Sequence, residues 1–185
     1  MAFCIIHSAE RYMIDITAGL LANRRAVEEL IQSAENSMDV WMTSRAPGKW
    51  SPSQLTEHVA RSLDESTNVV AGRPTKFPTL PAFVRPITRG LLFKRVLKQG
   101  TFPKARTNKA MNPETGPATP EEARLRLETA CSAFERECLA HAQRMDRLQT
   151  GIFGEVSIAD FVRFTEIHTR HHNKQMQPPG AASRA

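Results

Sequence analysis

Three of the six histidines of this 185-residue chain lie close together near its end, at positions 168, 171 and 172. His168 and His172 are four positions apart, so on a helix their imidazoles share one face, about 5–6 Å apart at Cβ, near enough to bind one ion. A lone pair of this spacing is a weak signal, because it more often reflects two solvated or hydrogen-bonded side chains. The pair therefore raises a metal site as a hypothesis that needs a third ligand from another element.

Four segments have the apolar spacing of long helices, at residues 17–43, 51–72, 119–145 and 157–177. The second begins with Ser51-Pro52-Ser53-Gln54 and the third with Thr119-Pro120-Glu121-Glu122. In both, a capping hydroxyl precedes a proline at the first helical position, and in the second Gln54 completes a capping box. The start of the third segment, at Thr119, is the most secure boundary in the chain.

No alternating β pattern competes with these helices, so we expect an all-α fold, a four-helix bundle with a long crossover connection between helices 2 and 3. The connection, residues 73–118, is rich in proline and contains a candidate short helix at 86–99. We expect one bundle domain of residues 17–177, with an N-terminal extension (1–16) and a C-terminal tail (178–185). Long connections in compact domains are often functional, so this one is expected to cover the end of a site.

The formal net charge of +6 is concentrated in the same connection. Residues 66–113 contain ten Lys and Arg side chains and no Asp or Glu. The simpler interpretation is a solvated, locally repulsive segment, and the alternative is an electropositive rim that concentrates an anionic substrate. Nucleic-acid binding is not expected, because the segment has few aromatic residues and no recognisable nucleic-acid-binding motif.

The composition indicates a single cytoplasmic domain with no membrane span. At 41% hydrophobic residues the chain can bury one sizeable core. No apolar run approaches the length of a membrane helix, and the apolar residues after Met1 are too few for a signal peptide. Three cysteines cannot all pair, and Cys131 and Cys138 have the spacing of buried helical positions, so we expect no disulfide framework.

The third ligand is supplied by His58, which follows Leu55 by three positions on the apolar face of the second helix. Together with His168 and His172 it gives three neutral nitrogens from two helices, with coordination positions left open as in catalytic zinc sites. Zinc, nickel and iron all accept imidazole. His171 points about 100° away from His172 and is not expected to be a ligand.

Three segments carry a resemblance to a known family: Trp50-Ser51-Pro52-Ser53-Gln54-Leu55-Thr56-Glu57-His58-Val59-Ala60, Phe153-Gly154-Glu155-Val156-Ser157 and His168-Thr169-Arg170-His171-His172-Asn173-Lys174-Gln175. Over roughly residues 20–177 the chain resembles the DinB-like superfamily, in particular the branch whose last helix reads H-x-x-H-H-x-x-Q. The resemblance implies a four-helix bundle, often a homodimer, that binds a divalent ion through the positions of His58, His168 and His172. Some relatives are S-transferases that use bacillithiol or mycothiol, and others are expected to be hydrolases.

We therefore predict a metal-dependent thiol S-transferase that acts on a small electrophilic substrate, with a low-molecular-weight thiol as partner. The alternatives are a metal-dependent hydrolase of amide or ester bonds and a non-enzymatic metal-binding module of a stress response. The transferase is preferred because the resemblance supplies it and because no carboxylate accompanies the histidines to act as a base. No catalytic side chain is assigned.

Overall fold

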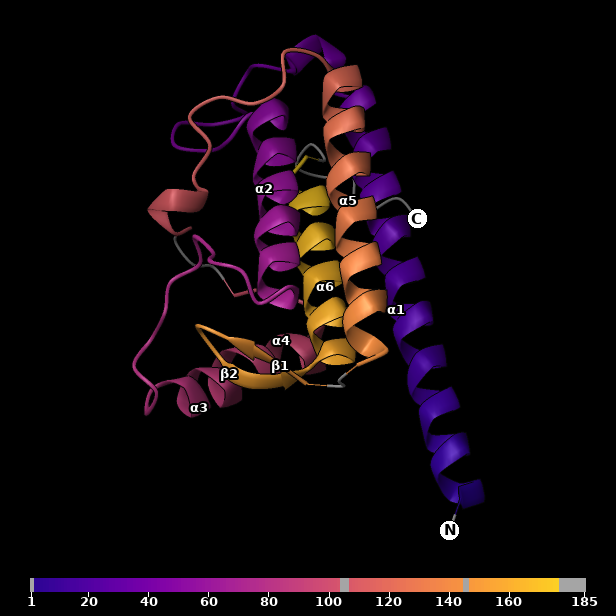
Figure 1. Cartoon of the computed structure of the whole chain (residues 1–185). Coiled ribbons are helices and arrows are strands. Elements are labelled where there is room, and N and C mark those ends of the chain that lie inside the picture. The colour runs from indigo at the N-terminus through magenta and orange to yellow at the C-terminus, as the bar shows by residue number, and fades with distance from the viewer. Residues whose placement is uncertain (1, 104–106, 145–146, 177–185) are drawn as a thin grey trace.

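The computed structural model describes residues 2–103, 107–144 and 147–176, and this part of the chain is mostly helical. Four long helices dominate it: α1 (Ala2–Glu35), α2 (Pro52–Val70), α5 (Pro120–Ala142) and α6 (Ile158–Met176). The shorter elements are 3-10 turns at Met38–Val40 and Lys109–Met111, α3 (Arg85–Thr88), a π-helical turn (Arg89–Phe93), α4 (Lys94–Gln99), β1 (Arg147–Thr150) and β2 (Gly154–Ser157). Figure 1 shows the long helices side by side, with α3, α4 and the two strands gathered at one end.

The two predicted capping motifs are confirmed and fix where α2 and α5 begin. The Ser51 hydroxyl accepts from the Gln54 backbone N–H at 3.3 Å, and the Gln54 side chain accepts from the Ser51 N–H at 3.0 Å. At α5, the Thr119 hydroxyl accepts from the Glu122 N–H at 3.2 Å. Each such cap contributes about 1 kcal/mol to the stability of the fold. At α2 the cap fixes the first two turns of the helix, which contain His58.

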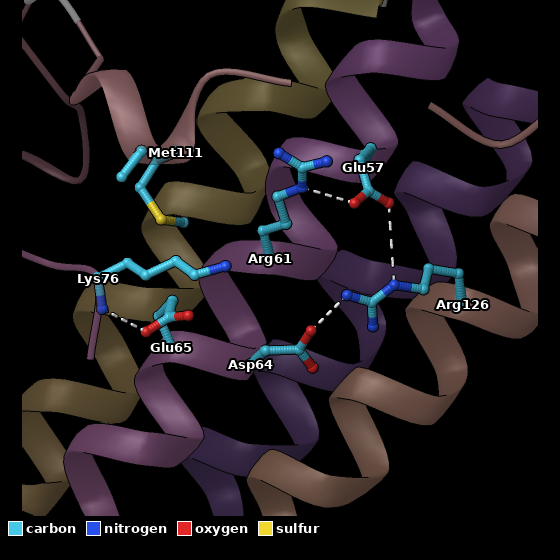
Figure 2. Close-up of a pocket in the computed structure, with 8 residues that line it drawn as sticks. Glu57, Arg61, Asp64, Glu65, Lys76, Met111 and Arg126 are labelled. Carbon is cyan, nitrogen blue, oxygen red and sulfur yellow. Dashed lines mark hydrogen bonds and ion pairs between the residues drawn. The ribbon is translucent and has the colours of Figure 1, made fainter. Parts of the chain in front are cut away.

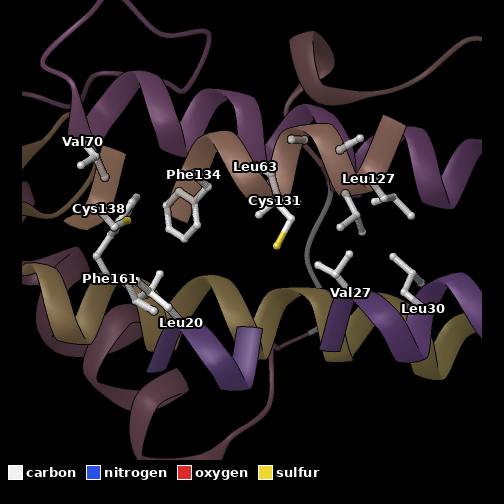
Figure 3. Packing of buried hydrophobic residues seen from close by; sticks show 14 of the residues in the cluster. Leu20, Val27, Leu30, Leu63, Val70, Leu127, Cys131, Phe134, Cys138 and Phe161 are labelled. Atoms are coloured by element: carbon white, nitrogen blue, oxygen red, sulfur yellow. The ribbon is translucent and has the colours of Figure 1, made fainter. Parts of the chain in front are cut away.

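The core lies between the long helices, with α1 and α2 each packed against both α5 and α6. Its fully buried side chains include Leu30 of α1, Leu63 of α2, Leu127 and Phe134 of α5, and Val162 of α6. Figure 3 shows side chains of all four helices meeting in this layer. Each buried side chain of this size contributes about 1.5–3 kcal/mol relative to exposure, so the core holds the helix faces in register.

The first helix differs from the prediction at both ends. It begins at Ala2, so the expected boundary between residues 16 and 17 falls inside α1, and it ends at Glu35, before Thr43. In the predicted range beyond Glu35, Met38 is 66% exposed, whereas Trp41 is buried. The 3-10 turn at Met38–Val40 carries Trp41 back to the core, so the apolar spacing continues past the point where the α-helix stops.

The expectation of no β structure is wrong for residues 147–157, which form an antiparallel hairpin. Leu148 pairs with Val156, and both are buried against the core. The turn depends on Gly154, whose φ of +69° favours glycine, and on Thr150, whose hydroxyl accepts from the Phe153 N–H at 2.9 Å. Strands of four residues are too short to give a recognisable alternation in sequence.

The candidate short helix at 86–99 is present but irregular. A π-helical turn at Arg89–Phe93 separates α3 from α4. Phe93 and Val96 are buried, while Ile87 and Leu91, which lie before them at helical spacing, are 57% and 73% exposed. The wider π turn rotates the following residues, so the buried face after it no longer continues the face before it.

The connection after α2 passes the hairpin and returns to the beginning of α2. The Leu80 N–H donates to the Gly151 carbonyl at 2.9 Å, beside the hairpin. Farther along, the Pro117 carbonyl accepts from the Trp41 indole N–H at 2.9 Å and from the Ser53 hydroxyl at 2.8 Å. The predicted C-terminal tail, 178–185, lies outside the described residues, and among the helices that are described none is long and apolar enough to cross a bilayer.

Candidate metal centre

Two of the long helices supply the three predicted ligands. His58 lies in the second turn of α2, just behind the capping box, and is 3% exposed. His168 and His172 occupy neighbouring turns of α6, and His172 is 6% exposed while His168 is partly buried. Because α2 packs against α6, all three imidazoles point into one space.

The three rings converge through nitrogen atoms. The Nε2 atom of His168 lies 3.4 Å from Nε2 of His58 and 3.1 Å from Nε2 of His172. One ligand atom from each of the three residues lies within 4.8 Å of the other two. Nitrogens bound to a tetrahedral zinc at 2.0–2.1 Å are about 3.3 Å apart, so these separations suit a divalent ion.

Hydrogen bonds at the far side of two rings leave Nε2 free to accept an ion. The Nδ1 atom of His58 lies 2.8 Å from the carbonyl oxygen of Met111, which only accepts, so Nδ1 carries the proton. His172 Nδ1 lies 3.1 Å from Oε1 of Gln175, which makes it the donor as well. In a neutral imidazole the other nitrogen, Nε2, then presents a lone pair, as ligation requires.

Gln175 also fixes the ring beside the centre. Its Nε2 donates to Nε2 of His171 at 2.9 Å, so the amide bridges His171 and His172 and its orientation is set at both ends. His171 is thereby placed as a hydrogen-bonded neighbour and does not join the cluster. Gln175 therefore acts beside the three histidines, through its hydrogen bonds to His171 and His172.

The environment keeps the imidazoles neutral. Burial lowers the pKa of His58 below the usual 6.5, opposed by the hydrogen bond to Met111 and aided by the positive charge of Arg61. Burial also places the pKa of His168 and of His172 well below 6.5, with the neighbouring histidines adding to the effect. Neutral imidazole is the form that binds metal, so protons compete little for this site at pH 7.

Two aromatic side chains flank the cluster. The ring centroid of Trp50 lies 4.6 Å from that of His58 and 6.0 Å from that of His172. Phe102, from the connection, lies edge-on to His168 at 5.3 Å. Trp50, which also packs against the core, forms a wall of the centre and donates its indole N–H to Asn112 at 2.9 Å.

A strap, residues 111–117, ties the connection to the start of α2. The side-chain amide of Gln54 donates to the carbonyls of Pro113 and Glu114, at 3.3 and 3.1 Å. Gly116 approaches so closely that a Cβ there would lie 2.2 Å from the carbonyl oxygen of Ser53. The strap positions the Met111 carbonyl next to Nδ1 of His58. No pattern in the sequence predicts this backbone contact.

Several cations of the basic connection serve the fold. Arg85 donates to the Leu80 carbonyl at 2.8 Å and Arg89 to the Glu155 carbonyl at 2.7 Å. Arg73 and Arg95 bond to Asn68 and Gln99. Lys104 and Arg106 lie outside the described residues. These four arginines are engaged in hydrogen bonds within the fold, which neither of the two interpretations of the basic segment had anticipated.

The carboxylate nearest in sequence to His58 faces away from the centre. Glu57 pairs with Arg61 at 2.6 Å and with Arg126 of α5 at 3.8 Å. Among the described residues, no acidic side chain joins the three histidines. The donor set is therefore three neutral nitrogens, which suits a divalent ion that retains its full charge and open coordination positions.

In the comparison with protein families, a model of the DinB superfamily fits residues 20–176, which is most of the chain. Neither the curated proteins nor the solved structures gave a match.

Proposed function

The chain belongs to the DinB superfamily, and from that premise we propose that it binds a divalent metal ion through Nε2 of His58, His168 and His172. The observation that carries the proposal is the convergence of these three nitrogens. The hydrogen bonds to Met111 and Gln175 support it. They keep the proton of His58 and of His172 on Nδ1, which leaves the lone pair of Nε2 for the ion. Zinc, nickel and iron each suit an all-imidazole donor set.

We propose further that the four long helices form a four-helix bundle in which residues 73–118 are the crossover connection. The bundle is taken as residues 17–177, with the segments on either side as extensions. The return of the connection from the hairpin to the start of α2 supports this topology. It brings residues of the connection, Phe102 and Met111, onto the histidines of α2 and α6.

The reaction proposed is transfer of a low-molecular-weight thiol to a small electrophilic substrate. When bound, the ion supplies a Lewis acid that favours the thiolate form of the thiol near neutral pH. The chain's own contribution is to hold three imidazoles neutral and to pack the rings of Trp50 and Phe102 against them. The histidine cluster contains no carboxylate that would act as a general base, which favours transfer over hydrolysis.

Activity assays of the metal-loaded protein separate the transferase from the other two functions. We expect consumption of a low-molecular-weight thiol together with a reactive halide or epoxide, and loss of this activity on chelation. Cleavage of amide or ester substrates without thiol consumption would favour the hydrolase instead. A metal-binding protein inactive in both assays would favour the non-enzymatic module, in which the ion joins α2 to α6.

A cytoplasmic location and a homodimer remain predictions, and sedimentation of the purified protein tests the latter.

A further inference from the structure

A pocket lies beside the histidine centre, between α2, α5 and the connection. It has a volume of about 340 Å³ and is lined by six charged side chains, Glu57, Arg61, Asp64, Glu65, Lys76 and Arg126. The remaining lining residues are Ala110 and Met111. Met111 belongs to both places, since its carbonyl accepts from His58. Figure 2 shows the charged side chains gathered around this space.

Four of the wall residues form ion pairs with one another. Arg126 of α5 pairs with Asp64 and lies 3.8 Å from Glu57. Glu57 in turn accepts from Arg61 at 2.6 Å. These ion pairs tie α2 to α5 and form one fixed side of the pocket, as the dashed lines of Figure 2 indicate.

Glu65 and Lys76 differ from the rest. Glu65 is 8% exposed, and its carboxylate accepts from the backbone N–H of Lys76 at 2.7 Å. Within the described ranges, no cationic side chain lies in ion-pair distance of Glu65, and no acidic one in ion-pair distance of the Lys76 ammonium. The cost of burying a carboxylate without a counter-charge applies to Glu65, whereas Lys76 is exposed and its ammonium is solvated. The pocket therefore holds one buried negative group, with one exposed positive group at its edge.

We propose that this pocket binds the ammonium-carboxylate head of a small α-amino acid or of a conjugate that carries one. The ligand ammonium is received by Glu65 and its carboxylate by Lys76, with the Arg61 guanidinium on the same wall. A simple anion would meet the Glu65 carboxylate, and a simple cation would meet Lys76. The sparse apolar lining favours a polar head over an apolar group. The inference rests on the pocket alone and holds whether or not the metal centre is a transferase.

Chemical-shift titration of the isotope-labelled, full-length, metal-free protein at pH 7 tests this binding site. We expect glycine and L-serine to give saturable shifts at the backbone amides of Glu65, Lys76 and Met111. Acetate and methylammonium, which each carry one of the two charges, should bind at least tenfold more weakly. Equal binding of acetate and glycine would overturn the proposal in favour of a plain anion site, and absence of any saturable shift would overturn it outright.

Two variants and their controls locate the binding. Glu65→Gln and Lys76→Met should each weaken glycine binding at least tenfold, because each removes one of the two charges. Glu128→Gln and Lys98→Met change exposed charges that do not line the pocket and should leave the affinity unchanged. Unaltered affinity in the folded Glu65→Gln and Lys76→Met variants would contradict the site. The comparison of glycine with acetate in the unmodified protein holds even if a variant fails to fold.

Discussion

At the scale of single residues, the centre depends on which nitrogen of each imidazole carries the proton. His58 and His172 each donate from Nδ1, to a backbone carbonyl and to a side-chain amide. Only the second of these partners can be changed by substitution. Gln175 is therefore the residue at which the orientation of a proposed ligand can be tested without removing the ligand.

Replacing Gln175 by Leu should weaken metal binding about 10–100-fold, the usual loss when the hydrogen-bond partner of a ligating histidine is removed. Gln175→Glu should retain most of the affinity, because a carboxylate still accepts from Nδ1 of His172. Competition with a chromophoric chelator measures both. Gln32→Leu, at an exposed position of α1, is the matched control. Equal losses in Gln175→Leu and Gln175→Glu would show that the amide acts only through packing.

Acid should destabilise the metal-free protein below pH 6.5. The pKa of His58, His168 and His172 in the folded protein lies below the usual 6.5, which these residues keep in the unfolded chain. At a pH between 6.5 and the lowered pKa values, the unfolded chain therefore binds more protons than the folded protein. Stability then falls as pH falls through this window and is unaffected by these groups above it. Urea unfolding between pH 5 and 8 measures the effect. The slope should shrink in a His168→Asn variant, and an identical slope there would assign it to other groups.

At the scale of elements, the strap of residues 111–117 decides whether His58 has its partner. Gly116→Ala would place a Cβ 2.2 Å from a backbone oxygen of α2, which forces the strap away. We expect a loss of both stability and metal affinity. Gly90→Ala is the control, since a Cβ there meets nothing within 4 Å. Metal titration and thermal melting of the two variants check this, and a Gly116→Ala protein with unchanged affinity would show that the strap is dispensable.

Some of these elements could be predicted from the sequence and others could not. The starts of α2 and α5 were predictable because a capping hydroxyl and a proline act locally. The juxtaposition of His58 with His168 and His172 followed from helix faces and from the family resemblance. The strap, the Trp50 wall and the Met111 carbonyl were not predictable, because they depend on where a long proline-rich connection settles on other elements. The π turn and the hairpin were missed because each is too short to leave a period in the sequence.

At the scale of the whole molecule, the proposed ion links α2 to α6, so its binding must appear in the stability of the fold. At a free metal concentration of 100 times Kd, binding adds about 2.7 kcal/mol. For a chain of this length that corresponds to a rise in Tm of about 5–11 °C. Thermal melts with and without metal measure it. A metal-free protein that is already unfolded at 25 °C would identify the ion as structural and argue against an open reactive site.

The most direct test of the account is the metal content of the purified protein beside a His58→Ala variant, measured by elemental analysis after dialysis against a weak chelator. A His141→Ala variant, which alters a buried histidine bonded to the Arg147 carbonyl and outside the cluster, serves as the control. We predict close to one divalent ion per chain in the unmodified protein and in His141→Ala, and a large loss in a folded His58→Ala. Equal metal content in the unmodified protein and His58→Ala would contradict the three-histidine centre.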